Sequence, residues 1–249
     1  MKQRIGLIIL VLFGMTNLRA QDAVDKRTLI DVPTAATLDR GSFDINLRMF
    51  ANGGLLGAVA VGITPRFMFG LSYGGENVIG AGDVNWNPAP GIQARVRLLD
   101  ESFATPAVTI GFDSQGYGAY DDALNRYRIK SKGFFVALSK NYPFLFNLGL
   151  HGGLNLSLEN DDNDKDLNLF LGADLSFSRE FRFMLEYDLA RNDDSTQAFG
   201  SGDGYLNAGV QWIFSDRLFL EFYLKNILEN GQRLSDVSRV FKIGYLEYF

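Results

Sequence analysis

The sequence predicts an all-β fold, a closed antiparallel transmembrane β-barrel of about 12 strands. Three observations predict it: long segments of alternating apolar and polar residues, an N-terminal export signal, and regularly alternating short and long connections. Residues 144–158, FLFNLGLHGGLNLSL, are the clearest segment, because nearly every second residue is large and apolar. Alternation places successive side chains on opposite faces of a strand, so one face here is apolar over about 50 Å, at roughly 3.3 Å per residue. Such a face must meet either another protein layer or lipid, and typical strands have only about 5–6 residues.

The first twenty residues, MKQRIGLIILVLFGMTNLRA, have the features of a cleaved secretory signal peptide. Lys2 and Arg4 give a positive start, a nine-residue apolar run follows over 5–13, and Ala20 offers a small residue at the cleavage point. The run is too short for a transmembrane helix, which needs about 20 apolar residues. We therefore expect an exported protein without a helical anchor.

Composition narrows the class of protein further. The chain has no Cys, which excludes a disulfide scaffold and a thiolate metal site, and we expect no cofactor. Its formal net charge is −5, and loss of the three basic residues of the signal peptide makes it −8, so nucleic acid is not an expected partner. We divide the chain into a signal peptide at 1–20, a periplasmic N-terminal segment at 21–40 and an outer-membrane barrel at 41–249.

Twelve segments are predicted as strands from the alternation of apolar and polar residues, and no segment has a convincing helical period. In chain order they are 41–50, 55–63, 66–74, 91–99, 106–112, 133–139, 144–158, 167–177, 181–189, 204–214, 218–224 and 240–249.

Connections between these segments alternate in length. Short links follow the even-numbered segments, as in TPR at 64–66 and SRE at 178–180, whereas longer links such as 159–166 and 190–203 mostly follow odd ones. Long loops on one rim and short turns on the other are typical of an outer-membrane barrel with both termini in the periplasm. The alternative is a secreted soluble barrel whose apolar stripes face a protein core.

The chain ends on KIGYLEYF, which partly resembles the C-terminal assembly signal of outer-membrane barrels. Lys242, Gly244 and the final Phe249 match that pattern, while Glu247 stands where a hydrophobic residue is usual. The resemblance implies that the barrel-assembly machinery and outer-membrane lipid are partners.

Charged and polar residues fall on the face opposite the apolar stripes, which would be the lumen of a barrel. Mixed charges there could line an aqueous path or pair across strands in a structural network that plugs the lumen, and we favour the network. The predicted lumen-lining residues are Asp44, Arg48, Arg95, Arg97, His151, Asp174, Arg182, Glu186, Asp188, Glu221 and Lys225.

His151 is the only histidine, and it invites comparison with outer-membrane phospholipases that use His, Ser and Asn on barrel strands. Gly153 occupies the nearest position on the same face, so this strand supplies no Ser within the roughly 3 Å that a base needs. A lumen-lining role is the default, and a partner from another strand stays open. We assign no catalytic residue.

The loop 159–168, ENDDNDKDLN, places Asp162, Asp164 and Asp166 at alternate positions, as a calcium loop does. Leu167 and Ala173 stand where that loop needs Gly and Glu. The three aspartates are weak candidates for a metal site, and a solvated acidic loop tip is the favoured interpretation.

A family resemblance covers about residues 28–132. It is carried by TLIDVPTAATLDRGSF, RFMFGLSYGGENVIG, NPAPGIQARVRLLDE, PAVTIGFDSQGYGAY and YRIKSKG in that order. This order resembles the YjbH-like proteins, outer-membrane β-barrel proteins linked to exopolysaccharide production. The chain is shorter than typical members and lacks their lipoprotein Cys, and the matched stretch holds no catalytic motif.

Together these observations favour an outer-membrane barrel that is not an enzyme. Its expected role is a pore, or an accessory factor in envelope or exopolysaccharide export with polysaccharide or export components as partners. A plugged structural or adhesive barrel and a barrel-embedded hydrolase acting on lipid or glycan are the alternatives.

Overall fold

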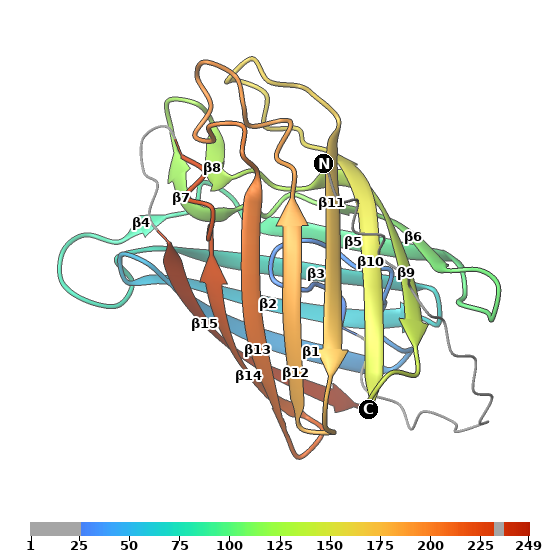
Figure 1. The fold of residues 1–249 in the computed structure, drawn as a ribbon. Coiled ribbons are helices and arrows are strands. Elements are labelled where there is room, and N and C mark those ends of the chain that lie inside the picture. The colour runs from blue at the N-terminus through green and yellow to red at the C-terminus, as the bar shows by residue number, and fades with distance from the viewer. Residues whose placement is uncertain (1–25, 232–236) are drawn as a thin grey trace, which may run out of the picture.

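The computed structural model describes residues 26–231 and 237–249, and these form one closed antiparallel barrel. Each strand pairs with its neighbours along the chain, and pairing of β1 with β15 closes the ring (Figure 1). The barrel strands are β1 (Ser42–Phe50), β2 (Gly54–Thr64), β3 (Phe67–Glu76), β5 (Gly91–Leu99), β6 (Ala107–Asp113), β9 (Gly133–Tyr142), β10 (Asn147–Leu156), β11 (Asn168–Ser176), β12 (Phe181–Asp188), β13 (Tyr205–Phe214), β14 (Leu218–Lys225) and β15 (Ser238–Tyr248). All twelve predicted segments are confirmed as barrel strands, and the fold class is confirmed with them.

The two faces of the strands differ as the alternation predicts. On β12, Phe181, Phe183 and Leu185 are exposed on the outer surface, while Arg182 and Glu186 are buried inside. Aromatic side chains gather at the short-turn end of the outer surface, where Phe181 stacks between Phe177 and Trp212, with ring centroids 6.0 and 6.2 Å away. Apolar side chains therefore cover the outside, as they must in a barrel that contacts lipid. No helix of the described residues is long and apolar enough to cross a membrane.

Three further short strands lie at the long-loop end of the barrel (Figure 1). β4 (Asn85–Trp86) extends the pairing of β3, and β7 (Tyr117–Asp121) pairs with β8 (Arg126–Ile129) in a separate hairpin. These stretches lie in predicted loops, because segments this short have no usable alternation.

The N-terminal segment differs from the sequence expectation. Residues 21–40 were expected in the periplasm, but residues 26–38 fold into the lumen, where the blue trace is enclosed by strands (Figure 1). We call residues 26–38 the plug. Its Leu29, Ile30 and Val32 are at most 2% exposed and pack in one apolar cluster with inward side chains of β9, β11, β12, β14 and β15. Burial of these three apolar side chains lowers the free energy of the folded protein relative to their exposure to water, which explains why the segment lies in the lumen.

Candidate functional site: the lumen and its plug

Glu186 holds the middle of the plug by its backbone. The carboxylate accepts hydrogen bonds from the amide nitrogens of Ile30, Asp31 and Val32, at 2.9 to 3.0 Å. The amide of Asn207, on β13, donates to the same carboxylate at 2.7 Å. Three successive N–H groups that point at one carboxylate bind it as a nest binds an anion.

Charged side chains fix the plug on its other sides. Asp31 forms ion pairs with Arg48 on β1 and Lys225 on β14, each at 2.6 Å. Arg48 also donates to the carbonyl oxygen of Ile30 at 3.1 Å. At the start of the plug, Lys26 pairs with Glu221, and Arg27 pairs with Asp44. Every one of these charges is nearly buried, so each depends on its partner for stability.

Polar groups of β5, β6 and β9 hold Thr28, Thr34 and Ala35 of the plug. Arg95 donates to the hydroxyl of Thr28 at 3.1 Å and to the carbonyl of Thr34 at 3.5 Å. The backbone N–H of Ala35 donates to the hydroxyl of Ser139 at 2.8 Å, and the carbonyl of Ala35 accepts from Thr109 at 2.6 Å. Both backbone groups of one plug residue are thereby satisfied by the wall.

His151 lies in a hydrogen-bond chain that its own strand could not have provided. Ser139, directly opposite it on β9, is 2.8 Å from Nδ1, and Asp174 on β11 is 2.7 Å from Nε2. Arg182 contacts the second oxygen of Asp174 at 3.2 Å. The Ser, His and Asp resemble the parts of a catalytic triad, but Ser139 is occupied by the plug and none of the three lines a described cavity. In this arrangement the chain of bonds positions the plug.

The structure places all eleven predicted lumen-lining residues on the inward face. Ten of them make hydrogen bonds or ion pairs with the plug or with other side chains of the wall, whereas the half-buried Arg97 makes none with its side chain among the described residues. Two further charged residues in the lumen were not among those predicted: Lys132, which pairs with Asp188, and the inward Asp113, which accepts from Gln93 at 2.6 Å. The polar stripe of β5 includes Gln93, so alternation could have identified it, but Lys132 precedes its strand and carried no such signal.

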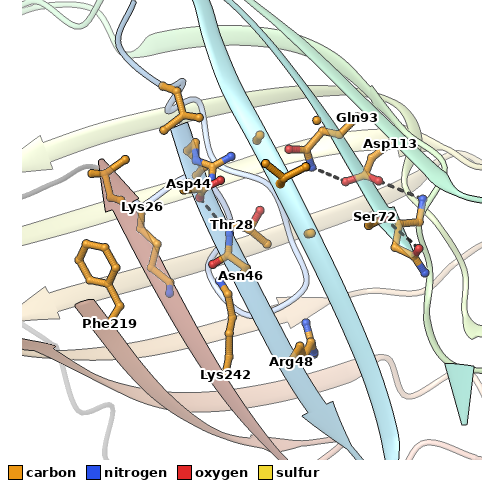
Figure 2. A pocket seen from close by; sticks show the side chains of 18 of the residues that line it. Lys26, Thr28, Asp44, Asn46, Arg48, Ser72, Gln93, Asp113, Phe219 and Lys242 are labelled. Atoms are coloured by element: carbon orange, nitrogen blue, oxygen red, sulfur yellow. Dashed lines mark hydrogen bonds and ion pairs between the residues drawn. The ribbon is translucent and has the colours of Figure 1, made fainter. Parts of the chain in front are cut away.

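Two cavities remain beside the plug. The short-turn vestibule, of about 450 Å³, is lined by Asp39, Phe219 and Tyr248 among others, and Figure 2 shows Lys26, Arg48 and Lys242 around it. The long-loop vestibule, of about 530 Å³, lies toward the other end of the barrel. Its lining includes Asn52, Glu76, Phe199, Tyr205 and Asn230.

Both vestibules share four lining residues, Arg48, Leu56, Gln115 and Tyr117. The guanidinium of Arg48 lies 4.1 Å from the centre of the Tyr117 ring, and the ammonium of Lys225 lies 5.2 Å from it. Tyr117 belongs to β7, so the inserted hairpin reaches down to the level where the vestibules meet. We call this contact between Arg48 and Tyr117 the constriction.

Basic side chains outnumber acidic ones in both vestibules. The short-turn vestibule is lined by six basic side chains, Lys26, Arg27, Arg48, Arg97, Arg182 and Lys242, and by the four acidic side chains Asp39, Asp44, Asp113 and Glu221. The long-loop vestibule is lined by Arg48, Arg128, Lys225 and Arg239 against Asp31 and Glu76. The chain as a whole is acidic, so this excess reflects placement and not composition.

The long loops close over one side of the barrel through Arg126 of β8. Its side chain is fully buried and pairs with Asp162 and Asp193, which come from two different loops. Burial alone would lower the pKa of Arg126, but the hydrogen bonds and charges of Asp193 and Asp162 raise it. Glu159 accepts from the backbone N–H groups of Tyr127 and Ser131, and burial raises its pKa despite these bonds.

The three aspartates proposed as weak metal candidates have separate roles. Asp162 is occupied by Arg126 and Lys130, Asp164 accepts from the backbone N–H groups of Asp194 and Ser195, and Asp166 is exposed. No cluster of three metal-binding side chains occurs among residues 26–231 and 237–249.

The residues assigned to the assembly signal lie on and just after β15. Lys242 faces the lumen, 3.5 Å from Glu221, and Gly244 pairs with Asn46 of β1. Phe249 is 81% exposed, and its N–H donates to the carbonyl of Gly41 at 2.8 Å. The final aromatic ring is thus presented at the short-turn rim.

No protein-family model and no curated protein sequence matches the chain. Among solved structures, the KdgM porin is similar over 84% of this chain and 99% of its own, with a TM-score of 0.50 and 11% identity. The NanC porin is similar over 83% of this chain and 99% of its own, with a TM-score of 0.46 and 11% identity. An outer-membrane channel from Pseudomonas putida F1 is similar over 86% of this chain and 97% of its own, with a TM-score of 0.45 and 13% identity. At this level of identity the likeness to the KdgM porin shows a shared barrel fold, and function has to be argued from the lumen.

Proposed function

We propose that this protein is a narrow outer-membrane channel for small anions, with a solute path that runs beside the plug. The observation that carries the proposal is the pair of vestibules, which extend toward opposite ends of the barrel and meet at the constriction. Cavities lined in part by charged side chains therefore lie on both sides of the plug, as a solute path requires.

The plug packs its apolar middle against one side of the lumen, and its Leu38 and Arg27 reach Ala60 and Met68 on the other side. Its apolar residues pack against Phe135, Phe170, Met184 and Tyr223, which come from β9, β11, β12 and β14. The opposite wall, on β2 and β3, presents the small inward residues Ala58, Ala60 and Gly70 to the short-turn vestibule. Small side chains on that wall leave room for a solute beside β1, β2 and β3.

The excess of basic side chains supports a preference for anions. A lumen with one prevailing sign of charge concentrates ions of the opposite sign, and rings of Arg and Lys favour anions in pores. Arg97 is the residue best placed to act on a passing anion, because its guanidinium has no partner among the described residues.

Single-channel recording in planar bilayers tests the proposal. Wild-type protein should give small currents with anions favoured, and Tyr117→Ala should raise the conductance because it removes one side of the constriction. Arg97→Glu should reduce the preference for anions without loosening the plug. Lys140→Ala is the matched control, since Lys140 lies outside both vestibules and pairs with Glu101. Absence of current from every variant would favour the plugged structural barrel instead.

A role in polysaccharide export is the second candidate, and it rests on the resemblance of residues 28–132 to the YjbH-like proteins. With the plug in place, Arg48 and Tyr117 lie 4.1 Å apart within the lumen. We therefore propose that a polymer could pass only after residues 26–38 have moved. We also place the short turns in the periplasm, from the rule that external loops are the long ones.

A further inference from the structure

The plug is attached to the barrel in the way a ligand is attached to a receptor. In the described part of the chain no barrel strand pairs with it, and its one ladder contact is a bridge within itself, between Thr28 and Pro33. Side chains of the wall, and not the sheet, supply its contacts. Its connection to β1 runs through Asp39 and Arg40, which are exposed.

Much of this recognition is directed at the peptide backbone. Glu186 accepts hydrogen bonds from three successive N–H groups. Arg48 donates to the carbonyl oxygen of Ile30, and Arg95 donates to the carbonyl oxygen of Thr34. The hydroxyl of Ser139 accepts from the backbone N–H of Ala35, and the hydroxyl of Thr109 donates to the carbonyl oxygen of the same residue. The N–H of Leu29 donates to the carbonyl of Val32 and that of Thr34 to the carbonyl of Arg27, so the bound backbone is a tight turn. A wall that binds backbone groups in this way can bind any segment that forms the same turn and whose side chains also fit.

Side-chain contacts then select the segment. Leu29, Ile30 and Val32 enter the apolar cluster around Phe170 and Met184. Asp31 points the other way and meets Arg48 and Lys225. An acidic residue flanked by branched apolar residues is therefore what the wall accepts.

We infer that the lumen is a binding site for a peptide that forms a tight turn with an acidic residue between branched apolar residues, and that residues 26–38 are its built-in ligand. This goes beyond the channel proposal, because it assigns the wall a macromolecular ligand in addition to a solute path. The two vestibules give water access to the charged wall from both ends, so release of the segment would leave Glu186, Arg48 and Lys225 hydrated and not stranded.

The test cuts the connection after folding and asks whether the segment exchanges. A protease site is inserted between Asp39 and Arg40 of the full chain, and the folded protein is cut in detergent. An isotope-labelled synthetic peptide of residues 26–38 is then added, and native mass spectrometry follows replacement of the cut segment. The same site inserted at 178–180, between β11 and β12, is the control, because cutting there frees no lumen segment.

The expected result is exchange for the labelled peptide that depends on the contacts described. Peptide methylated on the backbone nitrogens of Ile30, Asp31 and Val32 should fail to enter. An Asp31→Asn peptide should bind more weakly than the native peptide to wild-type barrel, and this difference should shrink in a Lys225→Met barrel.

Two results would overturn the inference. One is a cut segment that stays permanently and never exchanges, which would make it an ordinary part of the barrel core. The other is entry of the methylated peptide as readily as the native one. Because the readout is mass and not current, a failure here is distinct from a failure of the channel proposal.

Discussion

Glycine on the inward face of β10 makes room for the polar network of the lumen. A Cβ atom on Gly149 would lie 2.4 Å from Oδ1 of Asp174 and 2.7 Å from Nε2 of His151. On Gly153 it would lie 2.4 Å from the ring of Phe170, which belongs to the cluster around the plug. Gly149 and Gly153, on either side of His151, are therefore needed because side chains of β11 fill the space that a larger residue would occupy.

Gly149→Ala should destabilise the barrel by about 1–3 kcal/mol, because the extra methyl group overpacks the contact between His151 and Asp174. Gly152→Ala is the matched control on the same strand, since its Cβ would meet the flexible end of Leu171 at 3.1 Å and the carbonyl oxygen of Phe170 at an ordinary contact distance of 3.5 Å. Urea unfolding in lipid vesicles measures both. Equal losses of stability would show that the inward contact is not tight.

The hairpin of β7 and β8 is the element that joins the long loops to the lumen. Arg126 ties it to Asp162 and Asp193 in the loops above, and Tyr117 carries it down to the constriction. The hairpin pairs only with itself, so its position depends on these side-chain contacts. Loss of one buried cation should therefore free the hairpin while the twelve-stranded barrel stays intact.

Arg126→Met should detach the hairpin, because it removes the paired cation of buried Asp193 and leaves buried Asp162 with Lys130 alone, and breaking a buried ion pair typically costs about 3–5 kcal/mol. Hydrogen exchange at residues 117–129 should rise, and heat-modifiable migration of the barrel on detergent gels should stay unchanged. Arg128→Met is the control, since no ion pair of its side chain is described. Equal protection of the hairpin in both variants would contradict this role for Arg126.

The two rims of the barrel differ from each other. One rim carries short turns such as Ser178–Glu180 and the aromatic ring of Phe249, and the other carries the loops bound together by Arg126. Asn163, in an acidic loop, and Arg179, in a short turn, are exposed on opposite rims. The orientation of the protein in the membrane decides which of them faces the medium.

An introduced cysteine at Asn163 should react with an impermeant thiol reagent on intact cells, and one at Arg179 only after the outer membrane is opened. The expectation follows from long external loops and short periplasmic turns. The native chain has no Cys, so background labelling is absent. Earlier labelling at Arg179 would mean that the barrel is inverted and that the termini are not periplasmic.

The twelve strands, their two faces and the alternation of loop lengths can all be predicted from the amino-acid sequence alone. These follow from a period of two residues and from local composition, which need no knowledge of distant parts of the chain. The same alternation put Glu186, Asp174 and Lys225 on the inward face. It also put Phe170 and Tyr223 there, apolar exceptions in a polar stripe that could have indicated an apolar partner inside the lumen.

What fills the barrel follows from contacts between distant parts of the chain, which the sequence pattern does not reveal. Residues 26–38 have no period, so nothing local says whether Leu29 and Val32 are buried by lipid, by a partner or by the lumen. The contact between Ser139 and His151 depends on the register of β9 against β10. The ion pair of Arg126 and Asp193 joins residues that are 67 positions apart in the chain. Such contacts join residues that are distant in the chain, and their energy exists only once the barrel has closed.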